Sequence, residues 1–72
     1  MNPSKRALQT LYLLTDAEIE TVIEARNMVA SGGDIEGFTE IFLPSLLHSH
    51  GIYGMMQDMV QVASLLKFID EL

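Results

Sequence analysis

The chain has 72 residues and no cysteine, and ten acidic residues against four basic ones give it a formal net charge of −6. Its charge repels nucleic-acid backbones and anionic lipid surfaces, and the lack of cysteine excludes disulfide bonds. With 49% hydrophobic residues, the chain is predicted to fold as a single helical domain over residues 1–72. A core this small supplies only about 3–5 kcal/mol of stability, so we expect a homodimer.

Two helices are predicted in the first part of the chain. Asn2 and Pro3 are typical of a helix start, and the apolar residues that follow predict a helix over residues 3–14. The run from Thr15 to Glu18 has the spacing of a capping box, in which two side chains satisfy each other's backbone N–H groups. It predicts a second helix over residues 16–30, which ends at the two glycines of Ser31-Gly32-Gly33.

Asp34 is predicted to cap a third helical stretch that Pro44 interrupts. Because proline lacks an N–H and its ring crowds the preceding turn, we expect two pieces, 35–43 and 44–50, with a bend between them. His48 and His50 lie near the end of this stretch. Residues two apart do not share a helix face, so the two histidines are not expected to bind one metal ion. We expect them to serve as helix-end or interface residues, or as a pH-sensitive contact.

The last third of the chain has the most apolar helical pattern. A helix is predicted over residues 54–71, with a heptad-like seam that includes Met55, Met59, Val62, Leu66 and Ile69. A second apolar set covers much of the remaining circumference, so this helix should be central and should need partners on two faces. Methionine and tyrosine are common where one protein receives another. The candidate protein-interface residues are Tyr53, Met55, Met56, Met59, Val60 and Phe68.

The sequence resembles two families in part. The run from Asp34 to Ile69 resembles the second half of an acyl carrier protein, a family that carries phosphopantetheine on the serine after the aspartate. Ile35 stands in place of that serine, so the resemblance implies at most a degenerate carrier domain. The Ser31–Asp34 turn and the apolar residues after it are similar to those of small bacterial biofilm and acid-resistance regulators, which are dimeric all-helical connectors of signalling systems.

These features together predict an all-α bundle of four to five short helices without a catalytic site, a metal or a cofactor. No run reaches the roughly 18 apolar residues of a membrane span, and nothing resembles a signal peptide, so a cytoplasmic location is expected. The predicted function is that of a small regulatory protein, of the adaptor, inhibitor or anti-activator type, that binds a protein partner with a basic surface. The alternatives are a transcriptional or nucleoid-associated regulator that contacts DNA through Lys5, Arg6 and Arg26, or the degenerate carrier domain.

Overall fold

The structure is a computed structural model, and it describes residues 2–72. These residues form helices and turns without a strand, so the prediction of an all-α fold is confirmed. None of the helices in this range is both long and apolar enough to cross a membrane. In chain order the elements are α1 (Pro3–Tyr12), α2 (Asp16–Ala30), α3 (Ile35–Gly37), a π turn (Phe38–Phe42), α4 (Leu43–Ser49), a 3-10 turn (Met55–Gln57) and α5 (Met59–Asp70).

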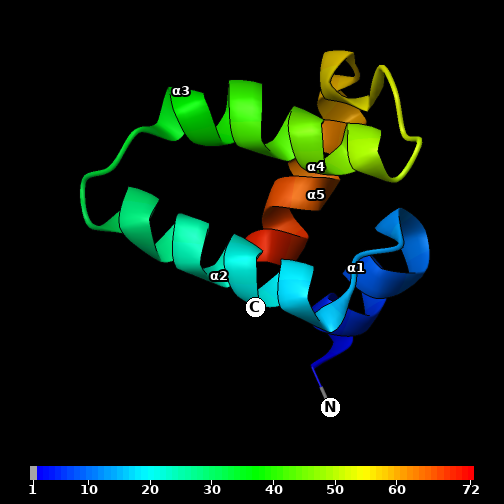
Figure 1. Cartoon of the computed structure of the whole chain (residues 1–72), viewed down its shortest axis with the longest axis horizontal. Helices are drawn as coiled ribbons and strands as arrows, with labels where there is room; N and C mark the ends of the chain where they lie inside the picture. Colours follow the sequence, from blue (N-terminus) through cyan, green and yellow to red (C-terminus); the bar gives the residue numbers. More distant parts are fainter. Residues whose placement is uncertain (1) are drawn as a thin grey trace.

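The helices surround α5, which contacts α1, α2 and the 3-10 turn. In Figure 1, α2 and the run from α3 to α4 lie one above the other, and α5 passes behind and between them. The prediction that the last helix is central is therefore confirmed. Its C-terminal end is held on two sides: Arg26 Nη1 of α2 donates to the Ile69 carbonyl at 3.0 Å, and Ser4 Oγ of α1 donates to Glu71 Oε2 at 3.0 Å.

The predicted helix starts in the first part of the chain are confirmed. The Asn2 side chain accepts the N–H groups of Ser4 and Lys5, which caps α1. At α2 the Glu18 N–H donates to Thr15 Oγ1 at 3.1 Å and the Thr15 N–H donates to Glu18 Oε1 at 2.9 Å, which is the reciprocal capping box.

Helix α1 ends at Tyr12, two residues earlier than predicted. Leu13 has φ 65, a left-handed conformation that L side chains other than asparagine and aspartate seldom adopt, and it stops the helix. This turn sends Leu14 into the core, where it is 5% exposed. Burial of Leu14 therefore accompanies the unusual backbone of its neighbour.

The predicted division of this stretch into two pieces, 35–43 and 44–50, is wrong. Residues 35–49 form one continuous helical run, seen as an unbroken ribbon in Figure 1, with a π turn just before the proline. In this turn the Leu43 N–H donates to the Phe38 carbonyl, five residues back instead of four. The wider turn accommodates Pro44 without a break, since a proline in a regular α-helix would clash with the carbonyl four residues earlier.

The last helix begins at Met59 and not at residue 54, so the predicted boundary is wrong. The Asp58 side chain accepts the N–H groups of Val60 and Gln61 and so caps α5. Met55 and Met56 consequently belong to the separate 3-10 turn. The predicted seam is also wrong in part: Leu65 and Ile69, each 2% exposed, face the core from α5, whereas Val62 and Leu66 are half-buried.

One apolar core draws on α1, α2, the π turn, α4, the 3-10 turn and α5. Its deepest side chains are those of Leu8, Ile19, Val22, Leu43 and Leu65. The full set of buried apolar residues comprises Leu8, Tyr12, Leu14, Ile19, Val22, Phe38, Leu43, Leu47, Met55, Leu65 and Ile69.

Candidate functional site

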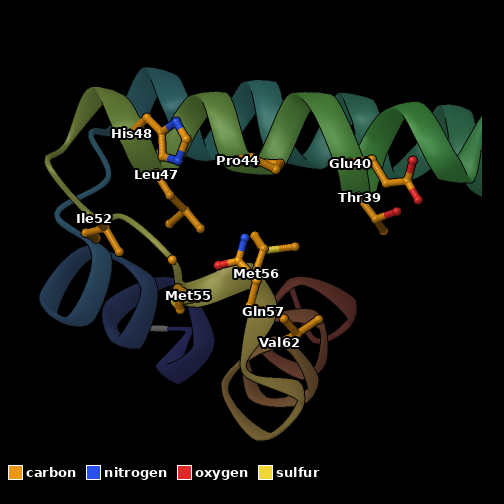
Figure 2. Close-up of a pocket in the computed structure, with 11 residues that line it drawn as sticks. Thr39, Glu40, Pro44, Leu47, His48, Ile52, Met55, Met56, Gln57 and Val62 are labelled. Carbon is orange, nitrogen blue, oxygen red and sulfur yellow. The ribbon is translucent and has the colours of Figure 1, made fainter.

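A groove of about 430 Å³ lies between the helical run 39–48 and the segment 52–62. Figure 2 shows its residues projecting from both sides into the space between the two segments. Its volume falls within the range of pockets that bind ligands or a partner's side chains, about 300–1,000 Å³. It is lined by Thr39, Glu40, Pro44, Leu47, His48, Ile52, Gly54, Met55, Met56, Gln57 and Val62.

The middle of the groove is apolar and adaptable. Leu47 and Met55 are core residues, with exposed fractions of 2% and 6%, so the floor is fixed by the packing of the fold. Pro44, Met56 and Val62 are half-buried beside them. Methionine side chains are flexible and polarisable and fit apolar groups of different shapes. The floor therefore suits apolar side chains of more than one shape.

The two ends of the groove carry different polar groups. Thr39 and Glu40 lie at one end and His48 at the other, with Pro44 between them (Figure 2). The Thr39 hydroxyl donates to the Ile35 carbonyl at 2.9 Å, which leaves its oxygen able to accept. The Glu40 carboxylate has no hydrogen-bond or ion-pair partner within residues 2–72. One end of the groove is thus rich in acceptors and negatively charged.

At the opposite end, the ring of His48 lies against that of Tyr53, with centroids 5.0 Å apart and an interplanar angle of 42°. Tyr53 is 72% exposed. Met59, in the first turn of α5, is 86% exposed and lies three residues before the groove residue Val62, hence on the same helix face. The next residue, Val60, is 77% exposed. It lies two residues before Val62 and therefore faces away from the groove. We refer to Tyr53 and Met59 as the apolar rim.

The structure brings most of the predicted interface residues to this region but gives them different surroundings. Tyr53 and Met59 form the rim, Met56 lines the groove, and Val60 is exposed on the side of α5 turned away from it. Met55 also lines the groove, but its side chain belongs to the core. Phe68 lies further along α5, half-buried against the core and outside the groove.

The two histidines face different parts of the molecule. His48 lines the groove, whereas His50 Nε2 lies 2.7 Å from Glu18 Oε1, which joins the end of α4 to the start of α2. The Thr15 backbone N–H, and to a lesser degree the His50 contact, hold the pKa of Glu18 below its ordinary value, against an opposing effect of burial. An ionised carboxylate only accepts, so His50 Nε2 carries the proton of this contact. Within residues 2–72 no three histidine, aspartate or glutamate side chains are placed to hold a metal ion.

Two of the cations considered for DNA contact have intramolecular partners. Lys5 Nζ lies 3.3 Å from Asp16 Oδ1, and the Gln9 amide donates to the same oxygen. These two contacts hold the pKa of Asp16 below its ordinary value. Arg26 donates to the Ile69 carbonyl and to Asn27 Oδ1. Lys5 and Arg26 therefore contribute to the contacts among α1, α2 and α5.

Sequence reasoning missed the contributions of Thr39, Glu40 and Gln57 to the groove. The sequence does contain a signal for the π turn in which Thr39 and Glu40 lie. Phe38 and Leu43 are both apolar and five residues apart, a spacing that places them on the same side of a π turn but not of an α-helix. The proline that follows adds to this signal.

Comparison with known proteins gives little further information. No family model matches the chain, and no solved structure matches it. The chain is similar to the cyclin-dependent kinase D-1 of Arabidopsis thaliana, with 30% identity over 57 residues. The matched region covers 79% of this chain but 14% of the kinase, so the chain corresponds to a small part of that protein.

Proposed function

We propose that this chain is a small non-enzymatic regulatory protein that binds a protein partner through the groove and the apolar rim, and that it acts as a homodimer in the cytoplasm. The observation that carries the proposal is that large exposed apolar side chains stand next to residues that line the groove: Tyr53, 72% exposed, lies against His48, and Met59, 86% exposed, is on the same helix face as Val62. Exposed apolar surface of this kind marks sites of association.

A protein partner accounts for this surface better than a small molecule does. A pocket of about 430 Å³ could hold a small ligand, but the rim residues Tyr53 and Met59 add exposed apolar surface beside it. Specific protein interfaces bury more than about 1,000 Å² in total and have an apolar centre with a polar edge. The groove has an apolar part at Met56 and Val62 and a charged end at Glu40 (Figure 2).

A homodimer is supported by the size of the chain and by Val60. Small cores commonly gain stability by association, and the Val60 side chain is 77% exposed on the face of α5 turned away from the groove. Pairing of α5 with a second copy on this face would remove Val60 from water and leave the groove and the rim to the partner. The similarity to cyclin-dependent kinase D-1 covers too little of that kinase to suggest its activity here.

The proposal is tested with Met59→Glu and a matched control, Met28→Glu. Met28 is 70% exposed on α2 and lies outside the groove and the rim, so both variants place a carboxylate at an exposed methionine and should keep the helical circular dichroism of the wild type. In sedimentation velocity, wild type, Met28→Glu and Met59→Glu should form dimers, whereas a third variant, Val60→Glu, should be a monomer because it places a charge on the face assigned to the dimer. When each variant is used to capture the partner from the native host, Met28→Glu should retain the partner and Met59→Glu should lose it.

Two results would contradict the proposal. A wild-type chain that stays monomeric at every concentration would exclude the homodimer. Equal capture of the same partner by Met59→Glu and wild type would exclude the rim as the binding surface.

A further inference from the structure

The π turn affects the main-chain carbonyl of Thr39, a residue that lines the groove. In an α-helix the Thr39 carbonyl would accept from the Leu43 N–H, and in a π turn it would accept from residue 44. The Leu43 N–H donates to the Phe38 carbonyl instead, and residue 44 is a proline, which has no N–H. The Thr39 carbonyl therefore accepts neither the α-helical hydrogen bond from residue 43 nor the π-type hydrogen bond from residue 44.

A charged acceptor lies next to this carbonyl. The Glu40 carboxylate has no partner within residues 2–72, and no lysine or arginine lines the groove. The Thr39 hydroxyl oxygen adds a third acceptor to the same end. A carboxylate brought here would find acceptors without donors, whereas a guanidinium or ammonium group carries several N–H donors and the charge opposite to that of Glu40.

We propose that the Thr39–Glu40 end of the groove binds a lysine or arginine side chain of a basic amphipathic segment in the partner, and that an apolar side chain of the same segment occupies the floor at Met56 and Val62. This inference rests on the proposed function, since it names the chemistry of the partner at the same site. The net charge of −6 favours approach of a basic segment over any other kind.

A segment of a larger chain fits the groove better than a free amine or a second copy of this protein. The apolar floor and the rim residues beside it favour an occupant that presents apolar groups in addition to one cation. A second copy would offer few cations, because the chain has four lysine and arginine residues, of which Lys5 pairs with Asp16 and Arg26 is held by the Ile69 carbonyl. Lys67 is exposed near the C-terminal end of α5, so a second copy stays an outcome that the test must exclude.

The test uses two synthetic peptides of the same helical pattern, one of leucine and lysine and one of leucine and glutamate, titrated into the isotopically labelled full chain. The leucine–lysine peptide should shift the amide signals of residues 39–48 and 54–57, and its affinity should fall as salt is raised. The leucine–glutamate peptide should not bind. Glu40→Gln should weaken binding on the order of tenfold, since it removes a charged hydrogen bond.

Two further variants distinguish binding to the Thr39 carbonyl and the Glu40 carboxylate from a general effect of the chain's net charge. Pro44→Ala restores an N–H at residue 44 that can occupy the Thr39 carbonyl, so it should weaken binding by several-fold while Glu40 remains in place. Glu20→Gln removes the same charge from an exposed position on α2 and should leave binding unchanged.

The inference is overturned if Glu40→Gln binds the lysine peptide as tightly as Glu20→Gln, if the shifted signals lie outside the groove, or if the acidic peptide binds equally well. A wild-type dimer that Glu40→Gln dissociates would also overturn it, because the occupant would then be a second copy. Loss of the native partner by Met59→Glu but not by Glu40→Gln would leave the proposed function standing and reject only this inference.

Discussion

Replacing Leu65 by alanine should destabilise the fold far more than the same replacement at Leu66, the next residue of α5. Leu65 is 2% exposed and belongs to the core, whereas Leu66 is half-buried at the edge of it. The seam predicted from the sequence, with Leu66 facing inward, gives the opposite order. This pair of variants therefore tests the rotation of α5 about its own axis.

The magnitudes follow from burial. Removing a fully buried leucine side chain costs about 2–5 kcal/mol, which includes the cavity left behind. At Leu66 part of the side chain is already in water, so the loss should be roughly 1 kcal/mol. At about 0.05–0.15 kcal/mol per residue, a chain of this length has a total stability of about 4–11 kcal/mol. Leu65→Ala could therefore remove half of it.

Urea denaturation followed by circular dichroism measures the difference. With a slope of about 1 kcal/mol per molar for a small chain, the midpoint should fall by about 2 M or more for Leu65→Ala and by about 1 M for Leu66→Ala. A larger loss at Leu66 than at Leu65 would refute the reasoning, because it would mean that Val62, Leu66 and Ile69 form the inward face.

Two other predictions concern the start of α2. Thr15→Ala should lower the free energy of unfolding by about 0.5–2 kcal/mol because it removes half of the capping box, and a thermal melt equal to that of the wild type would show that the cap contributes nothing. The folded-state pKa of Glu18 is lowered from its ordinary 4.5, so the stability this carboxylate contributes is present above about pH 4.5 and is lost as the pH falls through the lower folded value. Glu18→Gln keeps an acceptor for the Thr15 N–H, so it should remove this part of the acid dependence in unfolding titrations without abolishing the cap.

The parts of the fold that local chemistry determines could be predicted from the sequence. The capping residues at Asn2 and Thr15 locate the starts of α1 and α2, because each satisfies backbone N–H groups within three residues. The end of α1 could not be predicted. Leu13 takes a left-handed conformation that sequence rules assign to glycine, and it does so in a turn whose next residue, Leu14, is buried.

The error in the last helix has a different cause. Asp58 followed three residues later by Gln61 is a capping pattern, and Gln61 Nε2 does donate to Asp58 Oδ2 at 3.1 Å. The apolar periodicity continues through this cap into the 3-10 turn. A prediction from periodicity alone therefore merged the 3-10 turn and α5 into one helix. The groove was not predicted for the same reason, since it depends on Met56 being outside α5 and facing the π turn.

The π turn also has a consequence for how this sequence could change over time. A π turn amounts to an α-helical turn with one additional residue, and it lets Phe38 and Leu43 share the core side despite a spacing of five. Loss of one residue between them would give a spacing of four, which a regular α-helix aligns equally well. The proline would then crowd a carbonyl again, so relatives that lack the additional residue should lack the proline too, and the length of this segment and the residue at position 44 should vary together.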